Sequence, residues 1–223
     1  MPVNKLQRFA EIEQMDRVLE YTDYFENERA KPKGKWNRDI FKNKNPITLE
    51  LGCGKARTTT SLAKDYPERN FVGIDIKGAR IWKGAKRADK EGLANVRFLR
   101  TYIGNLDEYF AENEVAEIWI TFPDPWPRSG DRSKRLTSPR FLSIYKKILK
   151  PEAVIHFKTD NDDLFEYTLK TAAANNGKIL TRCADIYQKR VKDVTGLEVQ
   201  TSFEKKHLER KKTIKYVKIA MGF

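Results

Sequence analysis

Cysteine and histidine are scarce in this chain, since each occurs only twice among 223 residues. The two cysteines, Cys53 and Cys183, lie more than half the chain apart. That spacing suggests neither a disulfide framework nor a zinc site. No His, Cys and Asp cluster has metal-ligand spacing either, so we expect no metal. A reducing cytoplasm fits such a chain best.

Long apolar runs are absent as well. No stretch approaches the roughly 18 apolar residues of a membrane-spanning helix, and residues 1–5 are followed by mixed polar sequence without a secretory signal pattern. We therefore expect a cytoplasmic protein with no membrane partner. With 223 residues, 39% of them hydrophobic, the chain is long enough for one α/β domain and short for two. Its sequence does not decide between a monomer and a homodimer.

Positive charge is abundant and unevenly placed. The net charge is +13, and half of the 44 Lys and Arg residues fall in three short stretches, 29–44, 128–150 and 205–218. Each of these stretches holds a single acidic residue. Such clustering favours a polyanionic partner, because each phosphate contact releases condensed counterions. We therefore expect the chain to bind nucleic acid.

The spacing of apolar residues divides the chain at about residue 45. Residues 1–28 have apolar side chains every three or four positions and predict a helix, and residues 29–46 predict an extended basic arm. From residue 46 to 223, strand and helix patterns alternate. Strands are predicted at 47–51, 71–74, 96–99, 117–122, 153–157, 179–184 and 213–220, and helices at 56–65, 79–91, 139–149 and 164–174. This alternation predicts an α/β fold with a doubly wound, mostly parallel, seven-stranded sheet.

A glycine loop follows the first predicted strand of that domain. Its sequence is Glu-Leu-Gly-Cys-Gly-Lys, which places Glu50 just before Gly52 and Gly54. A dinucleotide-binding loop would need a third glycine where this chain has Arg57, and Glu50 would repel a pyrophosphate. The acid instead suits a cationic ligand such as S-adenosylmethionine. Asp75, at the end of the second strand, is a candidate acceptor for ribose hydroxyls.

A proline-rich loop follows the fourth predicted strand. Residues 121–128 read Thr-Phe-Pro-Asp-Pro-Trp-Pro-Arg, and each proline fixes φ near −65°. Asp124 and Trp126 are thereby held on a stiff segment at the expected ligand edge of the sheet. An acid beside a large aromatic is typical of a nucleobase site, where Trp126 would stack on a base.

These motifs resemble those of the bacterial tRNA (guanine-N7)-methyltransferases. The matching segments are 50–55, 73–76, 122–126, 134–137, 156–161, 164–167 and 201–204, in the family's order. The resemblance implies a Rossmann-like class I methyltransferase fold over residues 46–223. It also implies that the enzyme transfers a methyl group from S-adenosyl-L-methionine to N7 of guanine 46, in the variable loop of tRNA, and so forms 7-methylguanosine.

The resemblance also implies roles for individual residues. Asp124 falls on the active-site acid and among the cofactor contacts. The other implied cofactor contacts are Glu50, Gly52, Gly54, Asp75 and Tyr102. Implied substrate contacts are Arg128, Arg132, Lys134, Arg135, Asp160, Thr201, Ser202, Phe203 and Glu204. The chain departs from the family where Ala56 replaces a frequent glycine, where Tyr102 replaces an aspartate, and where residues 129–131 interrupt a basic run.

Three other interpretations stay open at this point. A methyltransferase for another RNA, or for an exocyclic amine, would share the cofactor, although amine-methylating enzymes usually carry Pro-Pro and an aromatic after the acid. A non-catalytic RNA-binding module would not need Glu50, Asp75 and Asp124 together. A nicotinamide dehydrogenase is disfavoured by Arg57.

Overall fold

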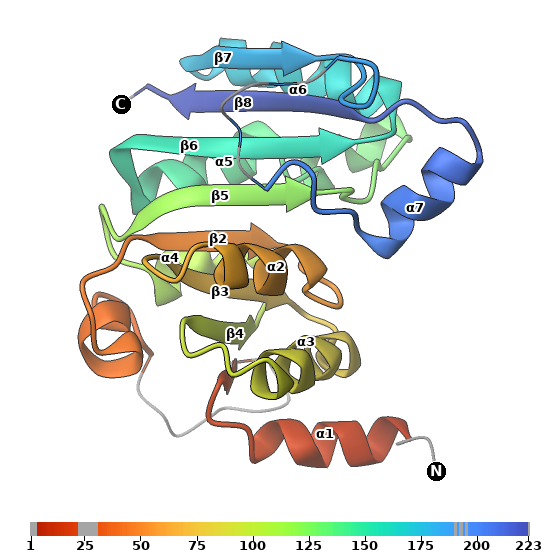
Figure 1. Cartoon of the computed structure of the whole chain (residues 1–223). Coiled ribbons are helices and arrows are strands. Elements are labelled where there is room, and N and C mark those ends of the chain that lie inside the picture. The colour runs from red at the N-terminus through yellow and green to blue at the C-terminus, as the bar shows by residue number, and fades with distance from the viewer. Residues whose placement is uncertain (1–3, 22–30, 190, 192–193, 195, 223) are drawn as a thin grey trace. The chain divides into compact units, whose positions relative to one another are not determined.

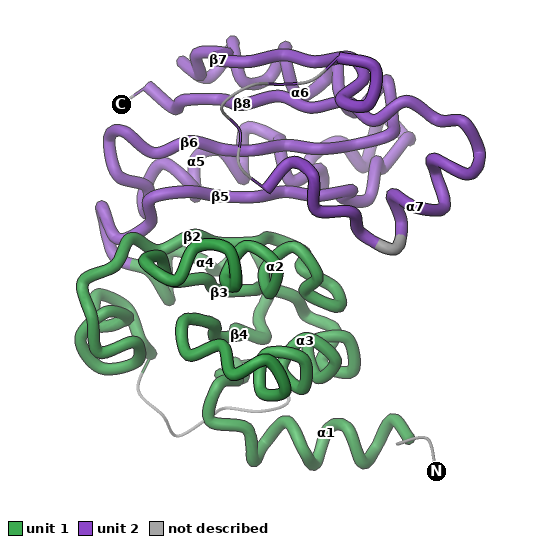
Figure 2. The backbone as a smooth tube through the Cα atoms, in the orientation of Figure 1, with its two compact units in different colours: residues 1–110 green, residues 111–223 purple. Residues whose placement is uncertain are grey.

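The computed structural model describes residues 4–21, 31–189, 191, 194 and 196–222. The chain divides into two units, residues 1–110 and residues 111–223 (Figure 2). No helix within the described ranges is both long and apolar enough to cross a membrane.

The first unit is built on four parallel strands. In spatial order these are β1 (Val18–Glu20), β4 (Val96–Arg100), β3 (Asn70–Asp75) and β2 (Ile47–Leu51). Helices α2 (Arg57–Asp65) and α3 (Gly78–Lys90) pack on them, and α1 (Lys5–Glu13) packs on α3 (Figure 1). Because the strands are parallel, β2, β3 and β4 end at one edge. This edge carries the glycine loop after β2, Asp75 as the last residue of β3, and Tyr102 after β4.

The N-terminal region corrects one prediction. The helix predicted over residues 1–28 ends at Glu13, and β1 follows as a strand beside β4. Residues 1–3 and 22–28 of that predicted helix lie outside the described part. All three β1 residues are buried, because β4 offers them a hydrogen-bonding edge. The described chain therefore has eight strands where seven were predicted.

The basic arm predicted over residues 29–46 is not extended throughout, and its residues 29 and 30 lie outside the described part. A short π-helix, Trp36–Phe41, interrupts it. Trp36 is fully buried; its indole N–H donates to the Tyr109 carbonyl at 2.8 Å, and its ring stacks on Phe110 at 5.0 Å. Lys31 pairs with Glu108 in α4 (Leu106–Tyr109). This part of the arm is thus a structural component of the first unit.

The second unit has four strands of mixed direction. Their order is β5 (Val115–Thr121), β6 (Leu149–Thr159), β8 (Lys215–Met221) and β7 (Gly177–Cys183). β5 and β6 run parallel, and β8 is antiparallel to both β6 and β7. The helices are α5 (Pro139–Ile148), α6 (Asp162–Ala174) and α7 (Ser202–Glu209), and α7 lies beyond the carboxyl ends of β5 and β6 (Figure 1). All seven predicted strands and four predicted helices are present, most of them with shifted ends, whereas α4 and α7 were not predicted.

The burial of Trp36 generates a stability prediction. Trp36→Ala should lower the free energy of unfolding by about 3–5 kcal/mol, because it leaves a large cavity and an unpaired Tyr109 carbonyl. Arg38→Ala, an exposed change in the same short helix, is the matched control. Urea unfolding followed by circular dichroism measures both. Equal midpoints for the two variants would mean that the arm does not belong to the folded unit.

Candidate functional site

The glycine loop of the first unit is bonded to the end of β3. The Gly52 and Cys53 N–H groups both donate to the Ile74 carbonyl, at 2.8 and 2.9 Å. Gly52 has a φ of 71° and Gly54 a φ of 54°, which favour glycine. A Cβ placed on Gly52 would meet no atom within 4 Å. The loop therefore has a tight turn with open space at Gly52, as the close approach of a ligand to the backbone requires.

Asp75 fixes this loop. One carboxylate oxygen accepts the Gly54 N–H at 2.9 Å, and the other accepts the Lys77 N–H at 2.8 Å. The side chain is almost fully buried. Because each carboxylate oxygen has two acceptor positions, Asp75 retains capacity to accept hydrogen bonds from ribose hydroxyls.

Glu50 acts on the helix that follows the loop. Its carboxylate accepts the backbone N–H of Thr59 at 2.8 Å and also the Thr59 hydroxyl. Thr59 lies in the first turn of α2, where unpaired N–H groups and the helix dipole favour a negative charge. Glu50 thus orients α2 against the loop, and its predicted contact with the cofactor stays a prediction.

Ala56 connects the loop to α2 in a left-handed conformation, with φ at 51°. A non-glycine residue there stores about 1 kcal/mol of strain. Its methyl group packs closely on α3, because a Cβ added to Gly84 would lie 2.7 Å from the Ala56 Cβ. The replacement of the family's frequent glycine is accommodated by a glycine on the facing helix.

The residues at this edge fit S-adenosylmethionine. Besides the open glycine turn and the buried acids, the Thr58 and Thr101 hydroxyls are buried and have no hydrogen-bond partner among the described residues. Such groups are costly unless a ligand satisfies them. Tyr102, next to Thr101, is 47% exposed, as a ring that stacks on an adenine would be. No sequence signal points to Thr58 or Thr101, because a threonine hydroxyl has no special significance until its burial is known.

In the second unit, the Asp-Pro-Trp loop leaves the end of β5. Two non-glycine residues that flank Asp124 have positive φ, 50° at Phe122 and 44° at Trp126. Such conformations persist only where surrounding contacts enforce them, and they cluster at functional sites. Asp124 itself is exposed at the tip of this constrained loop.

Arg135 stabilises the loop through hydrogen bonds to its backbone, which is not the role predicted for this residue. Its guanidinium donates to the Pro125 carbonyl at 3.0 Å and to the Trp126 carbonyl at 3.1 Å, and it lies 4.4 Å from the Tyr167 ring centre. Only 5% of the residue is exposed. We predicted an RNA contact here, but these donors are used inside the protein, so Arg135 supports the loop.

The neighbouring basic residues are presented to solvent. Arg128, Arg132 and Lys134 are exposed, on and beside a 3₁₀ turn, Ser129–Lys134. The Lys134 ammonium pairs with Asp131 at 2.7 Å and lies 4.9 Å from the Trp126 ring centre. Positive charge therefore borders the ring that is predicted to stack on a base.

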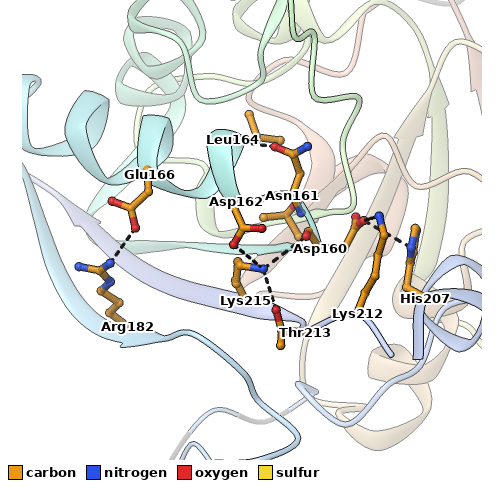
Figure 3. Close-up of polar contacts among 11 residues, drawn as sticks. Asp160, Asn161, Asp162, Leu164, Glu166, Arg182, His207, Lys212, Thr213 and Lys215 are labelled. Atoms are coloured by element: carbon orange, nitrogen blue, oxygen red, sulfur yellow. Dashed lines mark hydrogen bonds and ion pairs between the residues drawn. The ribbon is translucent and has the colours of Figure 1, made fainter. Parts of the chain in front are cut away.

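Asp160 follows β6 and lies in a cluster of cations (Figure 3). One carboxylate oxygen is 2.7 Å from the Lys212 ammonium and 3.4 Å from the His207 ring nitrogen Nδ1. Burial by itself would raise the pKa of the Asp160 carboxyl, but the Lys212 hydrogen bond and the electrostatic effects of His207 and Lys212 hold that pKa below its ordinary value. The acid is thus held ionised, as an acceptor for the N–H groups of a base must be.

The predicted substrate segment 201–204 begins α7. Thr201 and Glu204 form a reciprocal capping box. Glu204 is fully buried, whereas Phe203 is 60% exposed. The side chain of Ser202 lies outside the described part. Phe203 is therefore placed to meet a substrate, while Glu204 is engaged within the protein.

Lys158 is the partner of Glu204. Its ammonium lies 2.6 Å from the Glu204 carboxylate and donates to the Leu197 carbonyl at 2.9 Å. The Lys158 side chain is 2% exposed. Burial lowers the pKa of Lys158 below its ordinary value, although Glu204 acts in the opposite direction. This buried ion pair ties the end of β6 to α7 and to the segment before it.

Solved structures with similar folds are methyltransferases. The 16S rRNA methyltransferase KamB aligns with a TM-score of 0.66 at 16% identity, over 88% of this chain and 97% of its own. A 16S rRNA (adenine(1408)-N(1))-methyltransferase from Catenulisporales acidiphilia aligns with a TM-score of 0.59 at 16% identity, over 89% and 96%. At this identity the likeness establishes the Rossmann-like fold of class I methyltransferases, as predicted. Within the described residues, no group of three or more His, Cys, Asp or Glu side chains is arranged to hold a metal ion.

Sequence comparisons are more specific. Residues 44–217 match the family described as "Putative methyltransferase", which defines the chain as a methyltransferase by class. The tRNA (guanine-N(7)-)-methyltransferase of Christiangramia forsetii is 45% identical over 96% of both chains. That of Porphyromonas gingivalis is 48% identical over 85% of this chain and 77% of its own. The chain belongs to the tRNA (guanine-N(7)-)-methyltransferase family, which confirms the resemblance.

The buried ion pair generates a second stability prediction. Lys158→Met should lower the free energy of unfolding by about 3–5 kcal/mol, because the buried Glu204 carboxylate is left without a counter-charge. Arg182→Met is the matched control, since Arg182 pairs with Glu166 at a site where both side chains are about half exposed. That exposed pair should contribute less than about 1 kcal/mol. If urea unfolding shows similar losses of unfolding free energy in both variants, the buried pair stabilises the protein no more than the exposed pair does.

Proposed function

We propose that this protein methylates N7 of guanine 46 in the variable loop of tRNA, with S-adenosylmethionine as the methyl donor. Its similarity to curated tRNA (guanine-N(7)-)-methyltransferases over nearly the full chain supports the reaction. The observation that carries the proposal structurally is Asp124, an exposed carboxylate at the tip of a loop held in a strained conformation on both sides.

The cofactor is assigned to the carboxyl edge of the first unit. S-adenosylmethionine, when bound, supplies an activated methyl group. Gly52 and Gly54 admit it close to the backbone, and Asp75 accepts from ribose hydroxyls. Glu50 adds negative charge suited to the cationic sulfonium and ammonium groups, and Tyr102 offers a ring for adenine. The Thr58 and Thr101 hydroxyls join this set as further hydrogen-bonding groups.

Methyl transfer to guanine N7 needs little acid–base catalysis. Guanine N7 carries a lone pair and no proton in its neutral form, so it needs alignment with the methyl group and not deprotonation. The product is a cationic purinium. A carboxylate such as Asp124 or Asp160 stabilises that developing charge, or fixes the base through its N1 and N2 donors. We assign Asp124 the first of these roles, because its loop is the more constrained.

The tRNA backbone is assigned to the exposed cations near this loop. Arg128, Arg132 and Lys134 are placed to contact phosphates, and Phe203 and Thr201 add substrate contacts from α7. Contacts of this kind position the RNA without reading its sequence. A substrate of this kind also suits the cytoplasm. The division of the chain at residue 45 stays a prediction.

The role of Asp124 can be tested by removing only its charge. Asp124→Asn should lower kcat at least tenfold, about 1.4 kcal/mol of barrier, while the Kd for S-adenosylmethionine stays within about threefold, because the amide keeps an acceptor oxygen at the predicted cofactor contact. Asp163→Asn, an exposed acid in the first turn of α6, is the control. Methyl incorporation into tRNA and calorimetry give the two values. A kcat within a factor of three of wild type would remove Asp124 from the mechanism.

The RNA contacts can be tested by salt dependence. A triple Arg128→Gln, Arg132→Gln, Lys134→Gln variant should bind tRNA more weakly, with a slope of log K against log salt shallower by somewhat under one unit per lost contact. Neutralising Lys64, Lys90 and Lys178, which are exposed elsewhere, gives the same change of net charge. An unchanged slope in the first triple variant, or an equal change in both, would mean that these residues do not contact phosphates.

A further inference from the structure

Phe122 is the residue through which the Asp124 loop attaches to β6. Its backbone N–H donates to the Lys158 carbonyl at 2.8 Å, directly after the last paired residue of β5. Its φ of 50° is unfavourable for a phenylalanine. Contacts of the Phe122 ring must therefore contribute to holding this conformation.

Two groups approach that ring, and α7 is involved in both. The His207 ring lies parallel to it, with 6.1 Å between ring centres and 10° between planes. The Lys158 ammonium lies 6.0 Å from the Phe122 ring centre and is held by Glu204. Glu204 and His207 are three residues apart in α7, so they lie on one face of that helix. This face of α7 therefore lies against Phe122, where the Asp124 loop begins.

His207 has a second neighbour of functional interest. Its Nδ1 atom lies 3.4 Å from the Asp160 carboxylate, and the side chain is 18% exposed (Figure 3). One side chain therefore contacts the ring at the base of the Asp124 loop and also lies beside the other candidate substrate acid. Nothing in the reaction assigned above uses His207 directly.

We propose that His207 is a positioning residue for methyl transfer, which acts by stacking on Phe122 and so fixes the loop that carries Asp124. The inference rests on the proposed function for its kinetic consequence only. The imidazole neither touches the reacting atoms nor moves a proton; it limits the conformations of Phe122, and thereby those of Asp124, two residues further along the loop. This role requires a planar ring at position 207 and does not require a charge there.

That distinction selects the variants. His207→Phe retains a ring that can stack on Phe122, and His207→Ala removes it. Kcat for tRNA methylation should fall about tenfold or more in His207→Ala and stay within about threefold of wild type in His207→Phe. The KM for S-adenosylmethionine should be unchanged in both. Glu209→Ala, an exposed change at the end of α7, controls for substitution in this helix.

A double variant tests the route of the effect. If His207 acts through Phe122, Phe122→Leu with His207→Ala should be no slower than Phe122→Leu alone, because the stacking is already lost. If the double variant loses kcat by the product of the two single losses, His207 acts elsewhere, and that result would overturn the proposal. So would a His207→Ala variant with wild-type kcat, or a His207→Phe variant as slow as His207→Ala.

Hydrogen exchange supplies a measurement that does not depend on activity. The loop contains three prolines, so residues 122–127 carry only the Phe122, Asp124 and Trp126 amides. Exchange at the Phe122 amide should accelerate about tenfold in His207→Ala and little in His207→Phe. Unchanged protection in folded His207→Ala would refute the positioning role even if the wild-type protein proved to methylate another substrate. A wild-type protein inactive on tRNA would instead refute the proposed function.

Discussion

The second unit depends on a positive charge buried in its interior. Removing the Lys158 ammonium from water is costly, and the Glu204 carboxylate and the Leu197 carbonyl offset that cost. Each of these partners belongs to a different segment, so satisfying one charge fixes the approach to α7 and the helix itself. The backbone of Lys158 meanwhile accepts the Phe122 N–H. The exposed candidate groups, Asp124 and Phe203, therefore lie on segments that buried residues hold in place.

The first unit uses the same principle with the opposite charge. Asp75 and Glu50 are buried carboxylates, and each accepts a backbone N–H from the glycine loop or from the start of α2. Charged side chains are seldom buried without such partners. The two acids that are predicted to contact the cofactor therefore also build the turn to which the cofactor is assigned, so the proposed binding role falls on residues with a structural role.

The sequence predicted the core elements well because they are apolar and regularly spaced. β2 was predicted at its observed ends, and the Asp-Pro-Trp loop was predicted as a constrained turn. Prediction from the sequence failed where tertiary contacts determine the local structure. β1 continues the helical spacing of the residues before it, and only the free edge of β4 makes it a strand. Arg135 and Arg132 look equivalent in a basic run, yet one is buried under the loop and the other is exposed. α7 escaped notice because its charged sequence has little apolar periodicity.

Ala56 and Gly84 have a consequence for how this family varies. The two positions face each other so closely that a methyl group on both would bring two Cβ atoms to 2.7 Å. The interface has room for one methyl group, and here position 56 carries it. Alanine at both positions should therefore be rare among relatives. The residue at one position thus limits the residue at the other, although 28 residues separate them in the sequence.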